Sequence, residues 1–127
     1  MIVVDASVAV TALLNDGDAR RMLGDSALAA PHLVDAEVLH TLRRLLNRGQ
    51  MSAEEAELAV LRWRLLGVQR FPLIGLVPRI WALRDNLSAY GAAYTALAEA
   101  LDCPLVTTDA RLAAAPGPQC PITVLPA

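Results

Sequence analysis

The chain has 127 residues, of which 55% are hydrophobic, and its formal net charge is −2. This length supports one α/β domain over residues 1–127, with apolar residues to spare for a partner interface. The slightly acidic balance leaves any contact with nucleic acid to local arginines. All eleven basic residues are Arg. The absence of Lys excludes a P-loop nucleotide hydrolase, which needs the Lys of its phosphate loop, and a phosphoacceptor receiver domain.

The chain opens with Ile2-Val3-Val4, a run of β-branched apolar residues that ends in Asp5. Such a run predicts a strand buried on both faces of a parallel sheet. Ligands of these sheets gather at the carboxyl ends of the strands, which is where Asp5 lies. Residues 105–109 repeat the pattern, because an apolar run is again closed by Asp109. Two strands that deliver Asp to the same edge predict a carboxylate pocket suited to a metal ion.

Helical patterns follow the first strand. From Asp35 to Arg48 the apolar residues recur with the period of a helix, with Asp35 as the predicted N-cap and Gly49 as the residue that ends it. Glu37 lies in the first turn of this helix. Its predicted apolar stripe consists of Val38, Leu39, Leu42, Leu45 and Leu46. The elements predicted before it are a helix over 6–14, helical turns over 19–23 and a strand over 27–30 closed by Pro31.

Two capping signals organise the second half of the chain. Ser52-Ala53-Glu54-Glu55 is a capping-box sequence, and Ser88 is a predicted cap for a helix over 89–101. The apolar stripe expected on this second helix is Tyr90, Tyr94, Leu97 and Leu101. The predicted elements are a helix to residue 66, a strand over 68–73, a helix over 76–85 interrupted near Pro78, the helix over 89–101, a strand over 104–108, a helix over 110–114 and a strand over 122–125.

The alternation of strands and helices predicts an α/β three-layer sandwich, with a mostly parallel central sheet of four to five strands flanked by helices. Cys103 and Cys120 lack the spacing of a metal site, so we expect reduced thiols in a cytoplasmic protein. The N-terminus has no basic region and carries Asp5 in its apolar run, which excludes a signal peptide. No uncharged segment approaches the ~18 residues of a membrane span.

Four segments in order resemble the PIN-domain ribonucleases, most closely the toxin halves of VapBC toxin–antitoxin pairs. The resemblance covers essentially the whole chain, although each motif alone is weak. It implies a PIN-like, Rossmann-like sandwich, an endoribonuclease dependent on Mg²⁺ or Mn²⁺, a VapB-type antitoxin partner, and a homodimer. The segments are Val3-Val4-Asp5-Ala6-Ser7, Pro31 followed by Glu37, residues 87–98, and Leu105-Val106-Thr107-Thr108-Asp109.

The family implies four acidic residues around the metal, and three carry over to this chain. We expect Asp5 and Asp109 to bind the metal, and Glu37 to hold it directly or through water. Mg²⁺ prefers such hard oxygen ligands. A divalent cation supplies a nucleophile by lowering the pKa of its water, and it neutralises phosphate charge. Three carboxylates favour one retained ion over two. The matching family positions imply that Ser7 and Thr107 orient a ligand or a water.

The fourth acidic position falls on Gly91, where the family pattern has Asp. Counted from Ser88, this is the third helical position, where the helix dipole favours a carboxylate. Gly instead costs about 1 kcal/mol relative to Ala inside a helix. Glu99 lies about 12 Å further along the helix axis and is too far away to replace the missing carboxylate. Asp85 precedes the cap, and its use as a replacement is less favoured than a site that lacks the fourth carboxylate. We therefore predict weakened metal binding and reduced activity, partly restored by Gly91→Asp.

Each of these residues also has a simpler interpretation. Asp5 and Asp109 each precede a helix and are typical N-caps, and Glu37 satisfies a first-turn dipole. The order of the motifs favours the metal pocket over three separate caps. His32 and His40 are isolated and more typical of structural or solvent-facing residues than of ligands. Trp63 and Trp81 are expected in the core or an interface.

Three functions stay open from the sequence. The leading one is a Mg²⁺-dependent endoribonuclease toxin of a type II toxin–antitoxin system. The alternative is a catalytically inactive PIN module that acts by binding its antitoxin, and Gly91 is its main support. A small-molecule phosphohydrolase lacks the expected Lys and a paired Asp-x-Asp. Arg43, Arg44 and Arg48 either form a solvated helix face or contact RNA phosphates or an acidic segment of the antitoxin.

Overall fold

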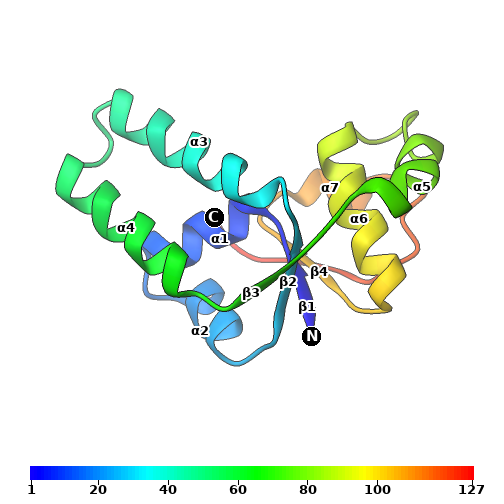
Figure 1. Cartoon of the computed structure of the whole chain (residues 1–127), viewed down its shortest axis with the longest axis horizontal. Coiled ribbons are helices and arrows are strands. Elements are labelled where there is room, and N and C mark those ends of the chain that lie inside the picture. Colours follow the sequence, from blue (N-terminus) through cyan, green and yellow to red (C-terminus); the bar gives the residue numbers. More distant parts are fainter.

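The structure, a computed structural model, describes residues 1–127. Its five strands form one sheet in the order β3-β2-β1-β4-β5, and every pair of neighbours is parallel (Figure 1). The predicted α/β sandwich with a parallel central sheet is therefore confirmed. The strands are β1 (Ile2–Val4), β2 (Leu28–Pro31), β3 (Val68–Phe71), β4 (Leu105–Thr107) and β5 (Ile122–Val124).

The first strand is the centre of the sheet. From β1 the chain builds β2 and β3 on one side, then returns to build β4 and β5 on the other. Val3 and Val4 are completely buried, as expected for a strand covered on both faces. Val4 pairs with Val106, so the residues that follow β1 and β4 emerge side by side at one edge. This edge is the point where the strand order reverses, the usual ligand site of an open α/β sheet.

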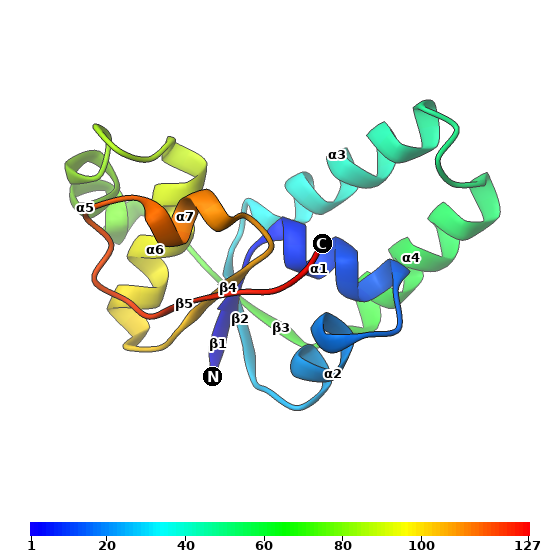
Figure 2. The same ribbon diagram turned by 180° about the vertical axis from the view of Figure 1, so that it is seen from behind.

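The helices form two layers, one on each side of the sheet (Figure 1). Helices α1 to α4 pack together on one side, and α6 covers β1, β2 and β4 on the other side with α5 and α7 beside it. Figure 2 shows β5 at the sheet edge and the C-terminus returning toward α1. No helix combines the length and the apolar character that crossing a bilayer requires. The helices are α1 (Ala6–Leu14), α2 (Asp18–Gly24), α3 (Val34–Asn47), α4 (Ala53–Leu65), the 3₁₀ helix η1 (Ile74–Leu76), α5 (Val77–Ala82), α6 (Ala89–Leu101) and α7 (Ala110–Ala114).

The capping signals at Ser52 and Gly49 are confirmed in the structure. The Ser52 hydroxyl accepts the Glu55 backbone N–H, and the Glu55 carboxylate accepts the Ser52 backbone N–H, each at 3.1 Å. Gly49 follows α3 with a φ of +69°, a backbone conformation that favours glycine. Pro78 lies in the first turn of α5, where its missing N–H costs nothing, so it opens this helix and does not interrupt it.

Asp35 is not the N-cap of α3, contrary to the prediction. The cap position falls on Leu33, which makes no capping hydrogen bond with its side chain. The Asp35 carboxylate instead accepts hydrogen bonds from Trp63 Nε1 at 2.8 Å and from both Nε and Nη2 of Arg70, at 2.7 and 2.8 Å. The reason is the guanidinium of Arg70 on β3, which offers a charged bidentate partner that a cap lacks.

The predicted apolar stripes are only partly buried. On α3 the buried residues are Val34, Val38 and Leu42, whereas Leu39 is exposed. Val34, Val38 and Leu42 follow one another at intervals of four residues along one side of the helix, and Leu39 lies about 100° further around it than Val38. Leu46 on α3, Tyr90 on α6 and Trp81 on α5 are also exposed, while Trp63 is buried in the core.

Candidate functional site

A cavity of about 1170 Å³ lies at the carboxyl ends of β1 and β4. It brings together Asp5, Glu37 and Asp109, which come from three distant parts of the chain. Ser7 and Gly91 line the same cavity, and so does Arg44 from α3. Of the other predicted residues, Thr107 lies behind Asp5 and hydrogen-bonds to it, whereas Arg43 and Arg48 are exposed on α3 outside the cavity.

The Asp5 carboxylate, at the start of α1, is held by three neighbouring groups. Its Oδ1 accepts the Val8 backbone N–H at 3.1 Å, which caps the helix, and the Ser7 hydroxyl at 2.6 Å. Its Oδ2 accepts the Thr107 hydroxyl at 2.5 Å. Burial raises the pKa of Asp5 even though these hydrogen bonds act to lower it. The cap and the pocket carboxylate are therefore one and the same side chain, which is only 8% exposed.

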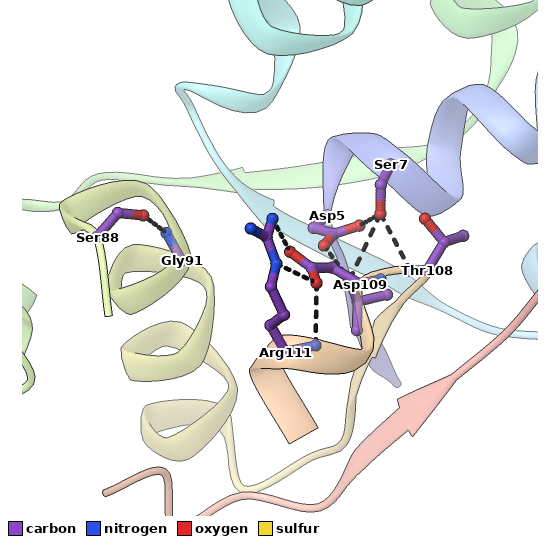
Figure 3. Close-up of polar contacts among 8 residues, drawn as sticks. Asp5, Ser7, Ser88, Gly91, Thr108, Asp109 and Arg111 are labelled. Carbon is purple, nitrogen blue, oxygen red and sulfur yellow. Dashed lines mark hydrogen bonds and ion pairs between the residues drawn. The ribbon is translucent and has the colours of Figure 1, made fainter. Parts of the chain in front are cut away.

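The two hydroxyls that hold Asp5 also join the end of β1 to the end of β4 (Figure 3). Ser7 Oγ accepts the Thr108 backbone N–H at 3.1 Å, and Thr107 Oγ1 accepts the Asp109 backbone N–H at 3.0 Å. The loop that carries Asp109 is thus fixed against the loop that carries Asp5. The family resemblance implied that Ser7 and Thr107 orient a ligand or a water. In the structure their hydroxyls hold the Asp5 carboxylate and the backbone of the loop that carries Asp109.

Glu37 reaches the cavity from the first turn of α3. Its Oε1 accepts the Tyr94 hydroxyl at 2.5 Å, a contact between α3 and α6. Burial raises the pKa of Glu37, the Tyr94 hydrogen bond acts against this, and the nearby charge of Asp5 raises it further. Tyr94 was expected only as a core residue. The signal that points to it is general, because a buried Tyr hydroxyl needs a polar partner.

Asp109 caps α7 and is paired with Arg111, a residue that sequence reasoning missed. Arg111 donates Nε to Oδ1 at 3.0 Å, Nη2 to Oδ2 at 2.9 Å and its backbone N–H to Oδ1 at 3.0 Å (Figure 3). These bonds from Arg111 hold the pKa of Asp109 below its usual range. A basic residue two positions after an acid that precedes a helix is the only sequence signal for this pair.

Gly91 lies in the first turn of α6, where its N–H donates to the Ser88 hydroxyl at 3.2 Å. A Cβ atom at this position would lie 3.1 Å from Cδ2 of Leu112 on α7. This approach supplies a local reason for glycine, since any side chain requires the buried Leu112 to shift by a few tenths of an ångström. Neither alternative acid replaces it, because Asp85 is exposed outside the cavity and Glu99 is bonded to Arg79.

The donor chemistry of the cavity fits a divalent cation in part. Asp5 and Glu37 offer hard oxygen ligands, and burial raises the pKa of both carboxyl groups. Both oxygens of Asp109 are occupied by Arg111. As the side chains stand, no group of three or more His, Cys, Asp or Glu residues is arranged to hold a metal ion. Asp5 and Glu37 are thus available ligands, and Asp109 joins them only if Arg111 moves.

Comparison with known proteins points the same way as this geometry. The PIN domain family model matches residues 2–118. Ribonuclease VapC9 of Mycobacterium tuberculosis is 55% identical over 126 residues, which cover 99% of this chain and 99% of that protein. A match of this length includes every residue of the cavity.

Two solved structures share the fold. Mycobacterium tuberculosis VapC20, described as a sarcin-ricin loop cleaving toxin, aligns with a TM-score of 0.64 and 21% identity over 90% of this chain and 94% of its own. VapBC2 of Rickettsia felis, bound to a DNA fragment from its promoter, aligns with a TM-score of 0.69 and 14% identity over 98% and 99%. At these identities the likeness concerns the fold alone. The family-model match and the identity to VapC9 show that this chain belongs to the PIN-domain family, among the VapC ribonucleases.

Proposed function

We propose that this protein is the toxin of a type II toxin–antitoxin system, an endoribonuclease that hydrolyses RNA phosphodiester bonds with Mg²⁺ or Mn²⁺. The single observation that carries the proposal is the convergence of Asp5, Glu37 and Asp109 on one cavity at the reversal point of the sheet. The identity to a protein named ribonuclease VapC9 supports the reaction class. The proposed metal ligands are these three carboxylates, with one ion favoured over two.

The residues of the cavity divide the work of hydrolysis between them. When bound, the divalent cation supplies the activated water and neutralises charge on the phosphate. Asp5 is fixed in place by Ser7 and Thr107, so its carboxylate needs no reorganisation to act as a ligand. Glu37 accepts the Tyr94 hydroxyl at Oε1, which leaves Oε2 as the oxygen that would hold the cation directly or through a water.

The proposed RNA contact on α3 is Arg44, because it is the one of the three predicted arginines that lines the cavity. Arg43 and Arg48 lie outside it, where they are free to contact more distant phosphates or an acidic segment of the antitoxin. The proposed partner is a VapB-type antitoxin, supported by the VapBC2 complex among the structures of the same fold. A homodimer in the cytoplasm is the proposed form of the protein.

A catalytically inactive module that acts by binding its antitoxin is the second candidate function. It is favoured by Gly91, which leaves the cavity without a carboxylate at the position where the family pattern has Asp. It is also favoured by the ion pair of Asp109 with Arg111, which removes a second ligand. Both features act in the same direction, so the proposed nuclease activity of this chain is impaired.

An RNA cleavage assay with a metal titration separates the two candidates. We expect the purified chain to cleave total cellular RNA weakly with Mn²⁺ and not at all with EDTA. Asp5→Asn should abolish the cleavage, and Gly91→Asp should raise it by roughly tenfold or more, as general contributions of site residues indicate. Gly91→Ala is the matched control, because it adds the same Cβ against Leu112 without a carboxylate.

The outcomes of this assay distinguish the two candidate functions and define the role of position 91. A gain with Gly91→Asp and none with Gly91→Ala supports the nuclease with a weakened site. No cleavage by the chain or by Gly91→Asp, in protein that still binds its antitoxin, supports the inactive module. Equal gains with both variants would show that position 91 acts through packing against Leu112 and not through a ligand.

A further inference from the structure

The ion pair between Arg111 and Asp109 is the feature of the cavity that the proposed function leaves unused. The two side chains form a fork, with Nε on Oδ1 at 3.0 Å and Nη2 on Oδ2 at 2.9 Å. In Figure 3 the guanidinium lies on the side of Asp109 that faces the start of α6, where Ser88 and Gly91 are drawn. One of the three carboxylates, that of Asp109, is thus already paired with a positive charge, the guanidinium of Arg111.

The chain contains a second arginine–aspartate fork, and the comparison is informative. Arg70 on Asp35 has a side chain only 28% exposed, it lies over the ring of Trp63, and its Nη1 also donates to the Val68 carbonyl at 2.8 Å. That pair is built into the packing of the fold. The side chain of Arg111 is 91% exposed, and its hydrogen bonds all go to Asp109. Exposed pairs of this kind are weak and open readily.

We propose that Arg111 is an internal counter-ion that holds Asp109 while no divalent cation is bound, and that it must leave Asp109 for the cation to bind there. This rests on the proposed function, since it requires a cation at these carboxylates. A guanidinium and a divalent cation on the same carboxylate repel each other, and solvent around the exposed Arg111 weakens this repulsion without removing it. The exposed guanidinium of Arg111 has solvent to move into, whereas the Asp109 backbone is fixed by Thr107.

Gly91 strengthens this competition. Both Gly91 and Arg111 line the cavity, and a glycine offers the guanidinium no second carboxylate to which it can transfer. Asp109 is therefore the only acidic partner that Arg111 has. The consequence is that the affinity of this chain for a divalent cation depends on Arg111 as well as on the three carboxylates.

Calorimetric titration of the full chain with Mn²⁺ alone tests the proposal without any activity measurement. We expect Arg111→Gln to bind Mn²⁺ roughly two- to fivefold more tightly than the unmodified chain, the range that an exposed ion pair supplies. Arg44→Gln is the matched control. It removes the same charge from the same cavity, but Arg44 forms no ion pair with any carboxylate, so its effect should be clearly smaller.

A second readout follows the guanidinium itself. In a ¹H–¹⁵N spectrum the Arg111 Nε–H signal, assigned by its loss in Arg111→Gln, should move when Mg²⁺ is added. The Arg70 signal serves as the internal control and should stay in place, because its fork with Asp35 lies outside the cavity. An Arg111 signal that stays in place while Mg²⁺ binds would overturn the proposal.

The outcomes separate this inference from the function on which it rests. If neither the chain nor Arg111→Gln binds Mn²⁺, the proposed metal site fails and the inference fails with it. If Mn²⁺ binds and Asp5→Asn abolishes the binding, the site stands. In that case equal affinities of Arg111→Gln and Arg44→Gln would overturn the role of Arg111 alone. Thermal melting of each variant confirms that it is folded.

Discussion

Asp5 shows how one side chain serves both the fold and the site. It caps α1 through the Val8 N–H, and it receives hydroxyls from Ser7 and Thr107 at the edge of the cavity. The structural interpretation and the functional one were alternatives in the sequence, but they do not exclude each other. Asp109 repeats this arrangement, since it caps α7 while it lines the same cavity. A cap residue at the carboxyl end of a parallel strand is already placed where a ligand binds.

The first prediction from Asp5 concerns stability without metal. Burial raises its pKa above the ordinary value, so the folded state binds more protons than the unfolded state, and stability falls as the pH rises through this interval. Asp5→Asn should therefore raise the free energy of unfolding at pH 7. The expected gain is on the order of 1 kcal/mol, the usual size when an unfavourably buried charge in a functional site is removed. The gain should disappear near pH 4. Urea unfolding in EDTA at both pH values measures it.

Asp16→Asn is the control for this prediction, because Asp16 is exposed. Its effect should be close to zero at both pH values. If Asp5→Asn is less stable than the unmodified chain at pH 7, the hydrogen bonds to Asp5 outweigh the cost of its burial. The prediction that the buried charge of Asp5 lowers the stability of the fold would then be wrong.

At the scale of elements, the sequence predicted what local chemistry decides. The bounds of α1 and α7 match the expected 6–14 and 110–114, and the capping box at Ser52 forms with both of its hydrogen bonds. These signals involve residues within one turn of each other. The family resemblance likewise drew on motifs that each lie within one element, and it placed Asp5, Glu37 and Asp109 on one cavity.

What the sequence could not predict depends on contacts between distant elements. Asp35 does not cap α3 because Arg70 on β3, 35 residues further along the chain, donates hydrogen bonds to its carboxylate. Leu39 is exposed although it fits the helical period, because the neighbouring elements cover only the side of α3 that carries Val34, Val38 and Leu42. The partner of Tyr94 is Glu37, which lies 57 residues earlier in the chain. Even for Arg111, only two residues from Asp109, the sequence signal is too general to identify the pair, which depends on the rotamers of both side chains.

A network around Glu99 joins α5 and α6 to the loop before β5 and gives a prediction at this scale. Its carboxylate accepts Arg79 of α5 at 2.6 and 3.1 Å and the Gln119 backbone N–H at 2.8 Å. Burial acts to raise the pKa of Glu99, but the bonds from Arg79 and Gln119 prevail and lower it. Glu99→Gln should cost about 1.5–3 kcal/mol of unfolding free energy at pH 7, as hydrogen bonds to charged groups do.

The pH dependence of this loss has a definite sign. A carboxylate whose folded pKa is lowered stabilises the fold above its ordinary pKa, and this contribution disappears as the pH falls through the folded pKa. The difference between the chain and Glu99→Gln should therefore shrink between pH 5 and pH 3 in urea unfolding. Glu57→Gln, on the exposed face of α4, is the control and should show no such trend. A difference that persists at pH 3 would assign the loss to packing.

At the scale of the whole molecule, two separate faces each carry three exposed apolar side chains. One face consists of Leu58, Leu61 and Leu65 on α4, and the other of Ile74, Val77 and Trp81 on η1 and α5. Figures 1 and 2 place α4 and α5 at opposite ends of the molecule. Two such faces suit two different partners, a second copy of the chain and an antitoxin.

The face that contains Trp81 is the better candidate for the homodimer. Trp81 is 67% exposed and large aromatic side chains contribute most to stable interfaces. A Trp in an interface contributes about 2 kcal/mol or more, and a symmetric homodimer loses two of them, so Trp81→Glu should weaken self-association roughly a thousandfold. Analytical ultracentrifugation over a range of concentrations measures this. Leu65→Glu, which places the same charge on the face formed by α4, should leave self-association unchanged. The opposite result would assign the dimer to α4, and a chain that stays monomeric throughout would refute the homodimer.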